Sequence, residues 1–519
     1  MNRRELGLGI AAAAVATNAV AQGRPPARDG AATAFYNSFN DQLGLVRRDL
    51  QADVRRFYEM NGWRPVWGQE RLRALGQAAA RADRHGLAAG DYFDLVGLVS
   101  DPARADMRLT EAVMAYARVL AEGRVRPESV EDLWEMQKNR TDLAVGLSGA
   151  LAADRLSAWL DGVAPDDIGY TNLSEGYIRY RDLALRGGWP AFRPGRRIEA
   201  GDLDSRIPAL RARLVAEGDL SPEEDAALAG AGDIYGPALE QAVRSFQTRH
   251  GLASDGVIGE GTQRSLSASA EDRARQIALN LERRRWLKRD LSPERIEVNT
   301  AAAIMVYWKD GRPVHSNRVV VGTPNNQTPS LEKQFASVVA NPPWYVPASI
   351  ARNEILPRGA AYLRSQNMYV TESGSVVQRA GPNAALGYVK FELRDSYAIF
   401  LHDTPSKAAF NNAYRHRSHG CVRVQNAVEF ARLLLSPDPS RLETFDSALD
   451  SGRTTRVETG REISVRLLYW TAFVDGQGRV AFREDVYNRD RRLAEALGIA
   501  ISLPRPVDDG RADPTDVGP

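Results

Sequence analysis

The hydrophobic periodicity of the chain changes once, near Arg295, and this change limits the folds that are open to it. Before that point apolar residues recur at helical spacing, as in the Leu109–Leu120 run. After it an alternation of period two dominates, beginning with a hairpin pattern in which an Asp-Gly pair lies between Ile304–Trp308 and Arg318–Gly322. The sequence therefore predicts a multidomain α+β protein that is helical first and mainly β later.

Length and composition set broad limits on the class of protein. The 519 residues suggest about three domains, and a hydrophobic fraction of 43% is enough to bury real cores. A formal net charge of +2 without a long basic run argues against nucleic acid as a partner. No apolar run reaches the roughly 18 residues that span a bilayer, so we expect no membrane span in the mature chain.

The first residues have the pattern of an export signal. Arg3 and Arg4 precede a short apolar core at Leu6–Ala16, and residues 19–21 (Ala-Val-Ala) form a cleavage motif. We therefore predict a cleaved signal peptide over residues 1–21, exported by the Sec or the twin-arginine route, and a periplasmic location.

Cys421 is the only cysteine of the chain. A lone thiol in an exported protein cannot form an internal disulfide, so its presence calls for a reason. Its neighbours are polar and basic, which predicts a thiol near solvent and positive charge, with a pKa lowered from about 8.5. Two alternatives remain: a small core hydrophobe, or a zinc ligand together with His416 and His419. We favour a nucleophile, with no metal and no cofactor.

The strand before the cysteine loop ends at His402, which we take as the general base for Cys421 in an acyl transfer. Phe400 shares its face of that strand. The small Gly420 would let nearby backbone amides turn toward an oxyanion. Arg423 would bind a substrate carboxylate or stabilise the thiolate. A satisfied core histidine is the alternative for His402.

The chain divides into several expected segments. A helix at 273–290 should connect two modules and present a solvated basic face. An insertion in the β-rich region is either a lid or a crossover, and we favour a lid. The predicted segments are a helical scaffold domain (34–200), a small helical module (203–270), a mainly-β catalytic domain (296–500) with the insertion (344–378), and a disordered tail (503–519).

Two motifs resemble known families. The small module resembles the three-helix peptidoglycan-binding module of bacterial wall enzymes in its pattern Ala242-Val243-x-x-Phe246-Gln247-x-x-His250-Gly251-Leu252, followed by Asp255-Gly256-Val257-x-Gly259-x-x-Thr262. The β-rich domain resembles the L,D-transpeptidase (YkuD-type) family in having His402, fifteen residues, and then Ser418-His419-Gly420-Cys421-Val422-Arg423. The stretches at 320–324, 341–347, 381–387 and 401–405 are similar to the long, multidomain branch of that family.

The resemblance implies a reaction and a set of partners. Cys421 would form a thioester with the third residue, a diamino acid, of a tetrapeptide stem, release D-alanine, and pass the stem to the amine of a neighbouring stem as a 3→3 cross-link. His402 would act as base and then as acid, and carbapenem-type β-lactams would acylate the thiol. Stem peptides, and glycan strands at residues 203–270, would be the partners.

The resemblance also assigns supporting residues. Ser418, His419 and Gly420 match supporting positions, although a purely structural role for His419 is equally open. The expected substrate-binding residues are Arg423, Phe400, Trp344 and Asn383, and Phe400 stands where relatives of this branch often carry tyrosine. The alternatives are a wall-binding protein with an idle catalytic domain, an L,D-carboxypeptidase that uses water, and an enzyme that attaches a protein lysine to the wall.

Overall fold

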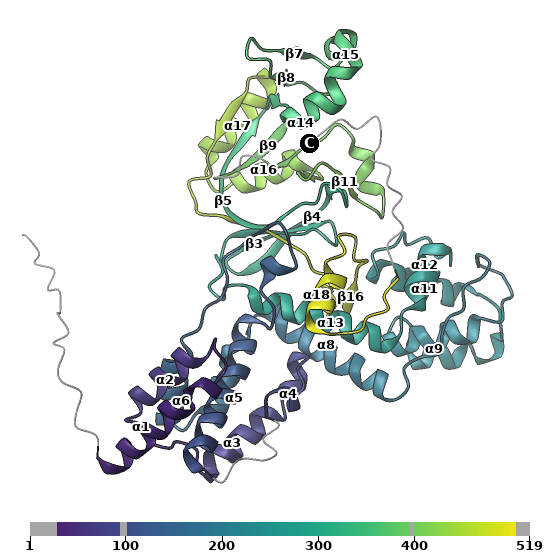
Figure 1. Ribbon diagram of the computed structural model, residues 1–519. Coiled ribbons are helices and arrows are strands. Elements are labelled where there is room, and N and C mark those ends of the chain that lie inside the picture. The colour runs from purple at the N-terminus through teal and green to yellow at the C-terminus, as the bar shows by residue number, and fades with distance from the viewer. Residues whose placement is uncertain (1–28, 94–100, 395–398, 505–519) are drawn as a thin grey trace, which may run out of the picture.

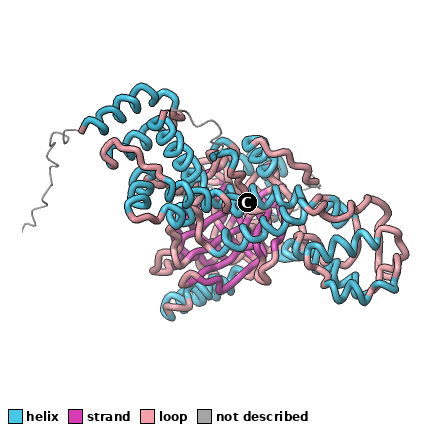
Figure 2. The backbone as a smooth tube through the Cα atoms, turned by 90° about the horizontal axis from the view of Figure 1, so that it is seen from below, coloured by secondary structure: helices cyan, strands magenta, loops and turns pink. Residues whose placement is uncertain are grey.

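The computed structural model describes residues 29–93, 101–394 and 399–504. The predicted signal peptide and all but the first two residues of the predicted tail lie outside these ranges. Within them, no helix is both long and apolar enough to cross a membrane. The protein is a multidomain α+β chain, with helical regions followed by a mainly-β domain, and Figure 2 shows the strands grouped together with helices on either side.

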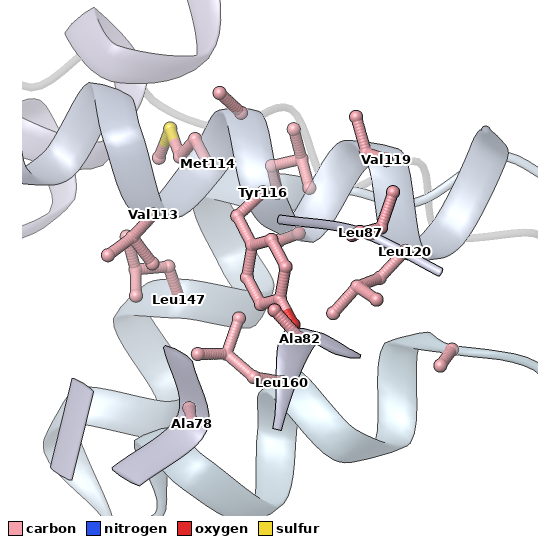
Figure 3. Packing of buried hydrophobic residues seen from close by; sticks show 14 of the residues in the cluster. Ala78, Ala82, Leu87, Val113, Met114, Tyr116, Val119, Leu120, Leu147 and Leu160 are labelled. Carbon is pink, nitrogen blue, oxygen red and sulfur yellow. The ribbon is translucent and has the colours of Figure 1, made fainter. Parts of the chain in front are cut away.

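The first region is a bundle of helices, which lies at the lower left of Figure 1. Its long helix α5 begins at an Asp101 side-chain cap with proline in the first turn, and ends before Gly123. Figure 3 shows apolar side chains of α5 meeting Leu147 and Leu160 from two other helices. The helices are α1 (Gly30–Gln42), α2 (Gln51–Met60), α3 (Gln69–Ala79), α4 (Gly90–Phe93), α5 (Pro102–Glu122), α6 (Leu143–Ala152), α7 (Leu156–Val163) and α8 (Ile168–Leu185).

A small helical module follows, with an apolar core of its own. Its motif residues hold the fold together: the Gln247 amide donates to Asp255 (2.9 Å) and to Thr262 (3.1 Å), and its carbonyl accepts from the Gly256 amide (2.8 Å). His250 is buried and 2.8 Å from the Ser265 hydroxyl. The helices are α9 (Ile207–Glu217), α10 (Pro222–Ala227), α11 (Pro237–Arg249) and α12 (Glu260–Ser267).

Helix α13 (Ala270–Trp286) joins the modules, and all of its basic residues except Arg275 are buried rather than solvated. Arg283 pairs with Asp490 at 2.5 Å, and Arg285 pairs with Glu282 at 2.7 Å. The expectation of a solvated basic face was wrong because α13 packs against α5 and α8 of the scaffold, and against β15 (Ala472–Val474) and α18 (Arg489–Leu497) of the C-terminal part. Helix α13 is therefore a central element of the molecule (Figure 1).

The mainly-β domain is built on a sheet whose strand order closes on itself. The order runs β5-β14-β2-β3-β4-β12-β10-β9, and β9 pairs again with β5. The turn between β3 and β4 has positive φ at Asp310 and Gly311, as a two-residue hairpin requires. The strands are β1 (Trp134–Glu135), β2 (Arg295–Asn299), β3 (Ile304–Lys309), β4 (Arg312–Gly322), β5 (Ser330–Ala340), β9 (Val389–Leu393), β10 (Leu401–His402), β11 (His416–Ser418), β12 (Val422–Val424), β13 (Thr455–Val457), β14 (Ser464–Leu468) and β16 (Val480–Phe482), which pairs with β15.

One face of this sheet surrounds a single apolar core. Alternate residues of the strands pack with helices α16 (Ala427–Leu435) and α17 (Pro439–Ser451) in one buried cluster. Because side chains alternate along a strand, the residues between them point to the opposite, outer face of the sheet.

Between β5 and β9 the chain forms a small unit, which lies at the top of Figure 1. It has a three-stranded sheet in the order β6-β8-β7 and its own apolar cluster, which Phe400 contacts from the main domain. Its elements are β6 (Trp344–Tyr345), α14 (Ala348–Ile350), a π-helix (Ala351–Ile355), α15 (Gly359–Ser365), β7 (Met368–Val370) and β8 (Val376–Gln378). We call this unit the insertion.

Candidate active site

Two short parallel strands bring the predicted nucleophile and base to one surface. Strands β10 and β12 pair in register, with His402 opposite Arg423, and the Val422 amide donates to the Phe400 carbonyl at 3.1 Å. Adjacent strands lie about 4.8 Å apart, and paired residues point to the same face. Phe400, His402, Cys421 and Arg423 are therefore gathered on the outer face of the sheet, opposite its core.

Cys421 is buried, with 3% of its surface exposed, so the prediction of a solvent-exposed thiol with a lowered pKa was wrong. The neighbouring Phe400 packs against the apolar cluster of the insertion, which lies over this part of the sheet. Burial raises the pKa of the Cys421 thiol to about 11, although a backbone hydrogen bond from Phe400 and the charges of Arg423 and Lys390 act in the opposite direction. In this conformation the thiol is protonated at neutral pH.

His402 is fully buried, and its orientation is set by the next residue in the chain. Its Nδ1 lies 2.5 Å from the Asp403 carbonyl oxygen, so Nδ1 carries the proton and Nε2 has the free lone pair. Nε2 has no hydrogen-bond partner within the described ranges, and so is not bonded to Cys421 here. Burial, followed by the charge of Arg423, lowers the pKa of His402 to about 3. The imidazole is thus a neutral base.

Asp403 orients the candidate base, a position that the sequence analysis did not single out. Besides the carbonyl that orients His402, its carboxylate accepts from the Tyr388 amide (3.0 Å) and pairs with Lys407. The available signal was its place immediately after the candidate base.

The cysteine loop is held by hydrogen bonds to hydroxyl groups. Ser418 Oγ accepts from the Gly420 amide (3.1 Å) and donates to the Cys421 carbonyl (2.6 Å). Thr328 Oγ1 donates to the Gly420 carbonyl (2.8 Å) and accepts from the Gly322 amide (2.9 Å). The Gly420 N–H is therefore occupied and unavailable to an oxyanion in this conformation, while its φ of +117° explains the glycine. Thr328, 92 residues before Gly420, carried no recognisable signal.

The two loop histidines have different partners. His416 Nε2 lies 2.9 Å from the Thr300 carbonyl oxygen, and His419 Nε2 lies 3.0 Å from Glu354 Oε1. Glu354 belongs to the π-helix of the insertion, a kind of element often found at functional sites. In the part of the chain that the structure describes, no cluster of three or more His, Cys, Asp or Glu side chains is placed to hold a metal ion.

The expected substrate-binding residues do not all come together. Phe400 lies beside His402, with ring centroids 5.6 Å apart, and the Lys390 Nζ is 4.5 Å from the Phe400 ring. Arg423 is fully buried next to this group. Trp344, in contrast, is 1% exposed in the core of the insertion, because its large ring fills that small core, and Asn383 is exposed on a loop.

Comparison with known proteins gives a consistent assignment. Residues 293–457 match the family model of the L,D-transpeptidase catalytic domain (YkuD), residues 52–176 that of a scaffold domain, and residues 204–266 that of a peptidoglycan-binding domain.

Two curated relatives match parts of the chain. A protein of Haemophilus influenzae named "Putative L,D-transpeptidase" is 31% identical over 220 residues, which cover 38% of this chain and 45% of the relative. An N-acetylmuramoyl-L-alanine amidase of Mycobacterium tuberculosis is 34% identical over 84 residues, 16% of this chain and 21% of the relative. The chain thus spans less than half the length of either relative.

Among solved structures, an L,D-transpeptidase from Xylanimonas cellulosilytica shares 20% identity with a TM-score of 0.18, and the match covers 53% of this chain and 98% of that chain. The family matches follow the same order along the sequence as the helical bundle, the small helical module and the mainly-β domain. Along the chain, the helical bundle thus matches the scaffold-domain model, the small helical module the peptidoglycan-binding model, and the mainly-β domain the model of the L,D-transpeptidase catalytic domain.

Proposed function

We propose that the protein is a periplasmic L,D-transpeptidase that acts on tetrapeptide stems of peptidoglycan. Cys421 attacks the carbonyl carbon of the third stem residue, the bond to the terminal D-alanine breaks, and a thioester forms. The side-chain amine of a neighbouring stem then attacks the thioester and yields a 3→3 cross-link. The observation that carries the proposal is the in-register pairing of β10 and β12, which places the thiol and a neutral imidazole on one surface.

The site residues have distinct roles in this reaction. His402 takes the thiol proton at Nε2 and later protonates the leaving amine, because Nδ1 is already committed to the Asp403 carbonyl. Arg423 stabilises the thiolate, as its lowering effect on the pKa of Cys421 indicates. Because the thiol is buried, the insertion must move before a stem reaches it, and its return would exclude water from the thioester.

The reaction is tested by incubating the protein with purified disaccharide tetrapeptide and analysing protein and products by mass spectrometry. We expect a thioester adduct lacking D-alanine, and a cross-linked dimer. Both should be absent in Cys421→Ala, which changes one small side chain. Tetrapeptide left intact by the parent protein would contradict the proposal, and D-alanine release without a dimer would identify a carboxypeptidase.

The buried thiol favours one second candidate, a wall-binding protein whose catalytic domain is idle. In that case purified sacculi would retain the parent and Cys421→Ala equally, and no stem product would form. A carbapenem-type β-lactam offers an independent check: a covalent adduct on Cys421 shows that the thiol is reactive, and its absence would support the idle domain.

A further inference from the structure

A large cleft lies on the outer face of the sheet, away from Cys421. Its volume is about 1020 Å³, at the upper end of the roughly 300–1,000 Å³ of ordinary ligand sites. Its floor is formed by β2, β3, β14 and the first part of β4, and its walls by the start of α8, the segment 284–291 at the end of α13, and the β15–β16 hairpin. Strand β12 pairs with the opposite end of β4, and none of the candidate active-site residues lines the cleft.

Aromatic rings with stacked guanidinium groups line this cleft. Arg295 lies over Trp308 at 4.2 Å and Arg284 over Trp470 at 4.1 Å from the ring centroids. Both tryptophans are partly exposed, as are Ile304 and Val306 on the floor. Flat aromatic and aliphatic surface of this kind suits the C–H faces of sugar rings, while the two stacked guanidinium groups are already paired with Glu297 (3.0 Å) and Asp167 (3.2 Å).

Two further guanidinium groups of the cleft have no carboxylate partner. Arg289 donates to the Leu287 and Ala121 carbonyls, both at 2.7 Å, and its Nε is buried without a hydrogen-bond partner within the described ranges. Arg483 donates to the Arg249 and Phe482 carbonyls at 2.8 and 2.6 Å. Over the residues that the structure describes, neither side chain forms an ion pair, and both are partly exposed. Burial lowers the pKa of Arg483 to about 10, so an incoming anion would relieve an unfavourable charge.

We propose that this interdomain cleft binds a carboxylate-bearing glycopeptide strand at a site separate from Cys421. Sugar rings lie against Trp308 and Trp470, and peptide carboxylates pair with Arg289 and Arg483, as bidentate arginine–carboxylate geometry allows. The choice of ligand rests on the proposed function, but the site does not. Because its walls come from the scaffold, the α13 segment and the catalytic domain, a bound strand would hold these parts together.

The test uses the full-length Cys421→Ala protein with purified disaccharide tetrapeptide, followed by hydrogen–deuterium exchange and by calorimetric titration. We expect protection of peptides covering residues 284–291 and 470–483. Arg289→Gln and Arg483→Gln should each weaken binding roughly tenfold, which corresponds to about 1.4 kcal/mol, because each loses a charge-assisted hydrogen bond. Arg64→Gln, the same change at an exposed scaffold arginine, should leave binding unchanged. Circular dichroism of each variant verifies folding.

Each outcome separates this site from the active site. Protection confined to residues 400–423 would overturn the cleft proposal while leaving the transpeptidase proposal intact. Protection of the cleft, together with no stem product from the parent protein, would support the cleft proposal and contradict the transpeptidase proposal. Equal protection by inorganic phosphate or acetate at the same concentration would reduce the cleft to an unselective anion site, and so would also overturn the proposal. Glycan freed of its peptides should bind more weakly than the glycopeptide.

Discussion

Cys421 and His402 are both electrically neutral in this conformation, because burial disfavours charge on each. Desolvation raises the pKa of the thiol to about 11 and lowers that of the imidazole to about 3. In the proposed reaction these two groups start as thiol and free base, and the thiol proton moves to the imidazole after a substrate has brought them together. Burial therefore disfavours an ion pair of Cys421 thiolate and His402 imidazolium in this conformation.

The first prediction concerns the titration of His402. Its folded pKa lies below its unfolded value of 6.5, so the neutral ring contributes stability that is present above about pH 6.5 and lost as the pH falls toward 3. We expect the His402 ring signals, assigned with His402→Gln in a histidine-labelled protein, to remain those of a neutral imidazole down to about pH 4. An NMR midpoint near 6.5 would show that the ring is solvated.

The second prediction concerns Thr328, whose hydroxyl bridges Gly322 and Gly420. Thr328→Val keeps the shape and removes both hydrogen bonds, which leaves a buried amide and a buried carbonyl unsatisfied at about 1–3 kcal/mol each. We expect the acylation of Cys421 by a β-lactam to be at least tenfold slower, because the cysteine loop loses the two hydrogen bonds that hold it in place. Thr328→Ser retains the hydroxyl and should remain close to the parent. Equal rates for the two variants would contradict this role.

At the scale of elements, the insertion contacts both the segment before His402 and the cysteine loop. Phe400 packs against the apolar cluster of the insertion, and Glu354 of its π-helix lies 3.0 Å from His419 in the cysteine loop. These are the contacts between insertion and site that must open for a substrate to enter. The Glu354–His419 contact is partly exposed, so its contribution is modest.

The third prediction is that Glu354→Ala makes the thiol more accessible. The loss of about 1 kcal/mol from the closed state would raise the open population roughly fivefold, and the rate of Cys421 alkylation by a small reagent should rise accordingly at constant pH. Glu372→Ala, at an exposed position of the same insertion, is the matched control. An unchanged alkylation rate in Glu354→Ala would mean that the contact does not hold the insertion closed.

At the scale of the whole molecule, α13 unites the scaffold with the catalytic domain through buried charges. Arg283 pairs with Asp490 at 2.5 Å and lies 3.6 Å from Glu131, and all three side chains are nearly inaccessible to solvent. Removing one partner of such a network strongly destabilises the fold, because the remaining carboxylates stay buried away from water.

The fourth prediction follows from that network. Arg283→Ala should lower the free energy of unfolding by about 3–5 kcal/mol, measured by urea denaturation of the full chain. Arg275→Ala, which removes an exposed ion pair with Glu271 on the same helix, should cost about 1 kcal/mol or less. Similar losses for both variants would show that burial of the Arg283 network does not matter.

Much of the local structure follows from the sequence. Apolar periodicity indicated the helices of the scaffold, and alternation with an Asp-Gly pair indicated the β3–β4 hairpin. The expected strand over 397–402 is described only from 399, and β10 within it has just two residues. Predictions of this kind are accurate because backbone preferences and the periodicity of side-chain orientation depend on residues that are near each other in the chain.

The sequence by itself predicted the order of the modules and the family model that residues 293–457 match, and it directed attention to the cysteine loop. Only the tertiary structure decided the surroundings of those residues. The polar neighbours of Cys421 suggested exposure, yet the thiol is buried, and the basic run of α13 suggested a solvated face, yet four other elements pack against this helix. Burial and charge pairing depend on contacts between residues that are far apart in the chain, such as Thr328 with Gly420 and Arg283 with Asp490. No local sequence pattern specifies which distant segment makes such a contact.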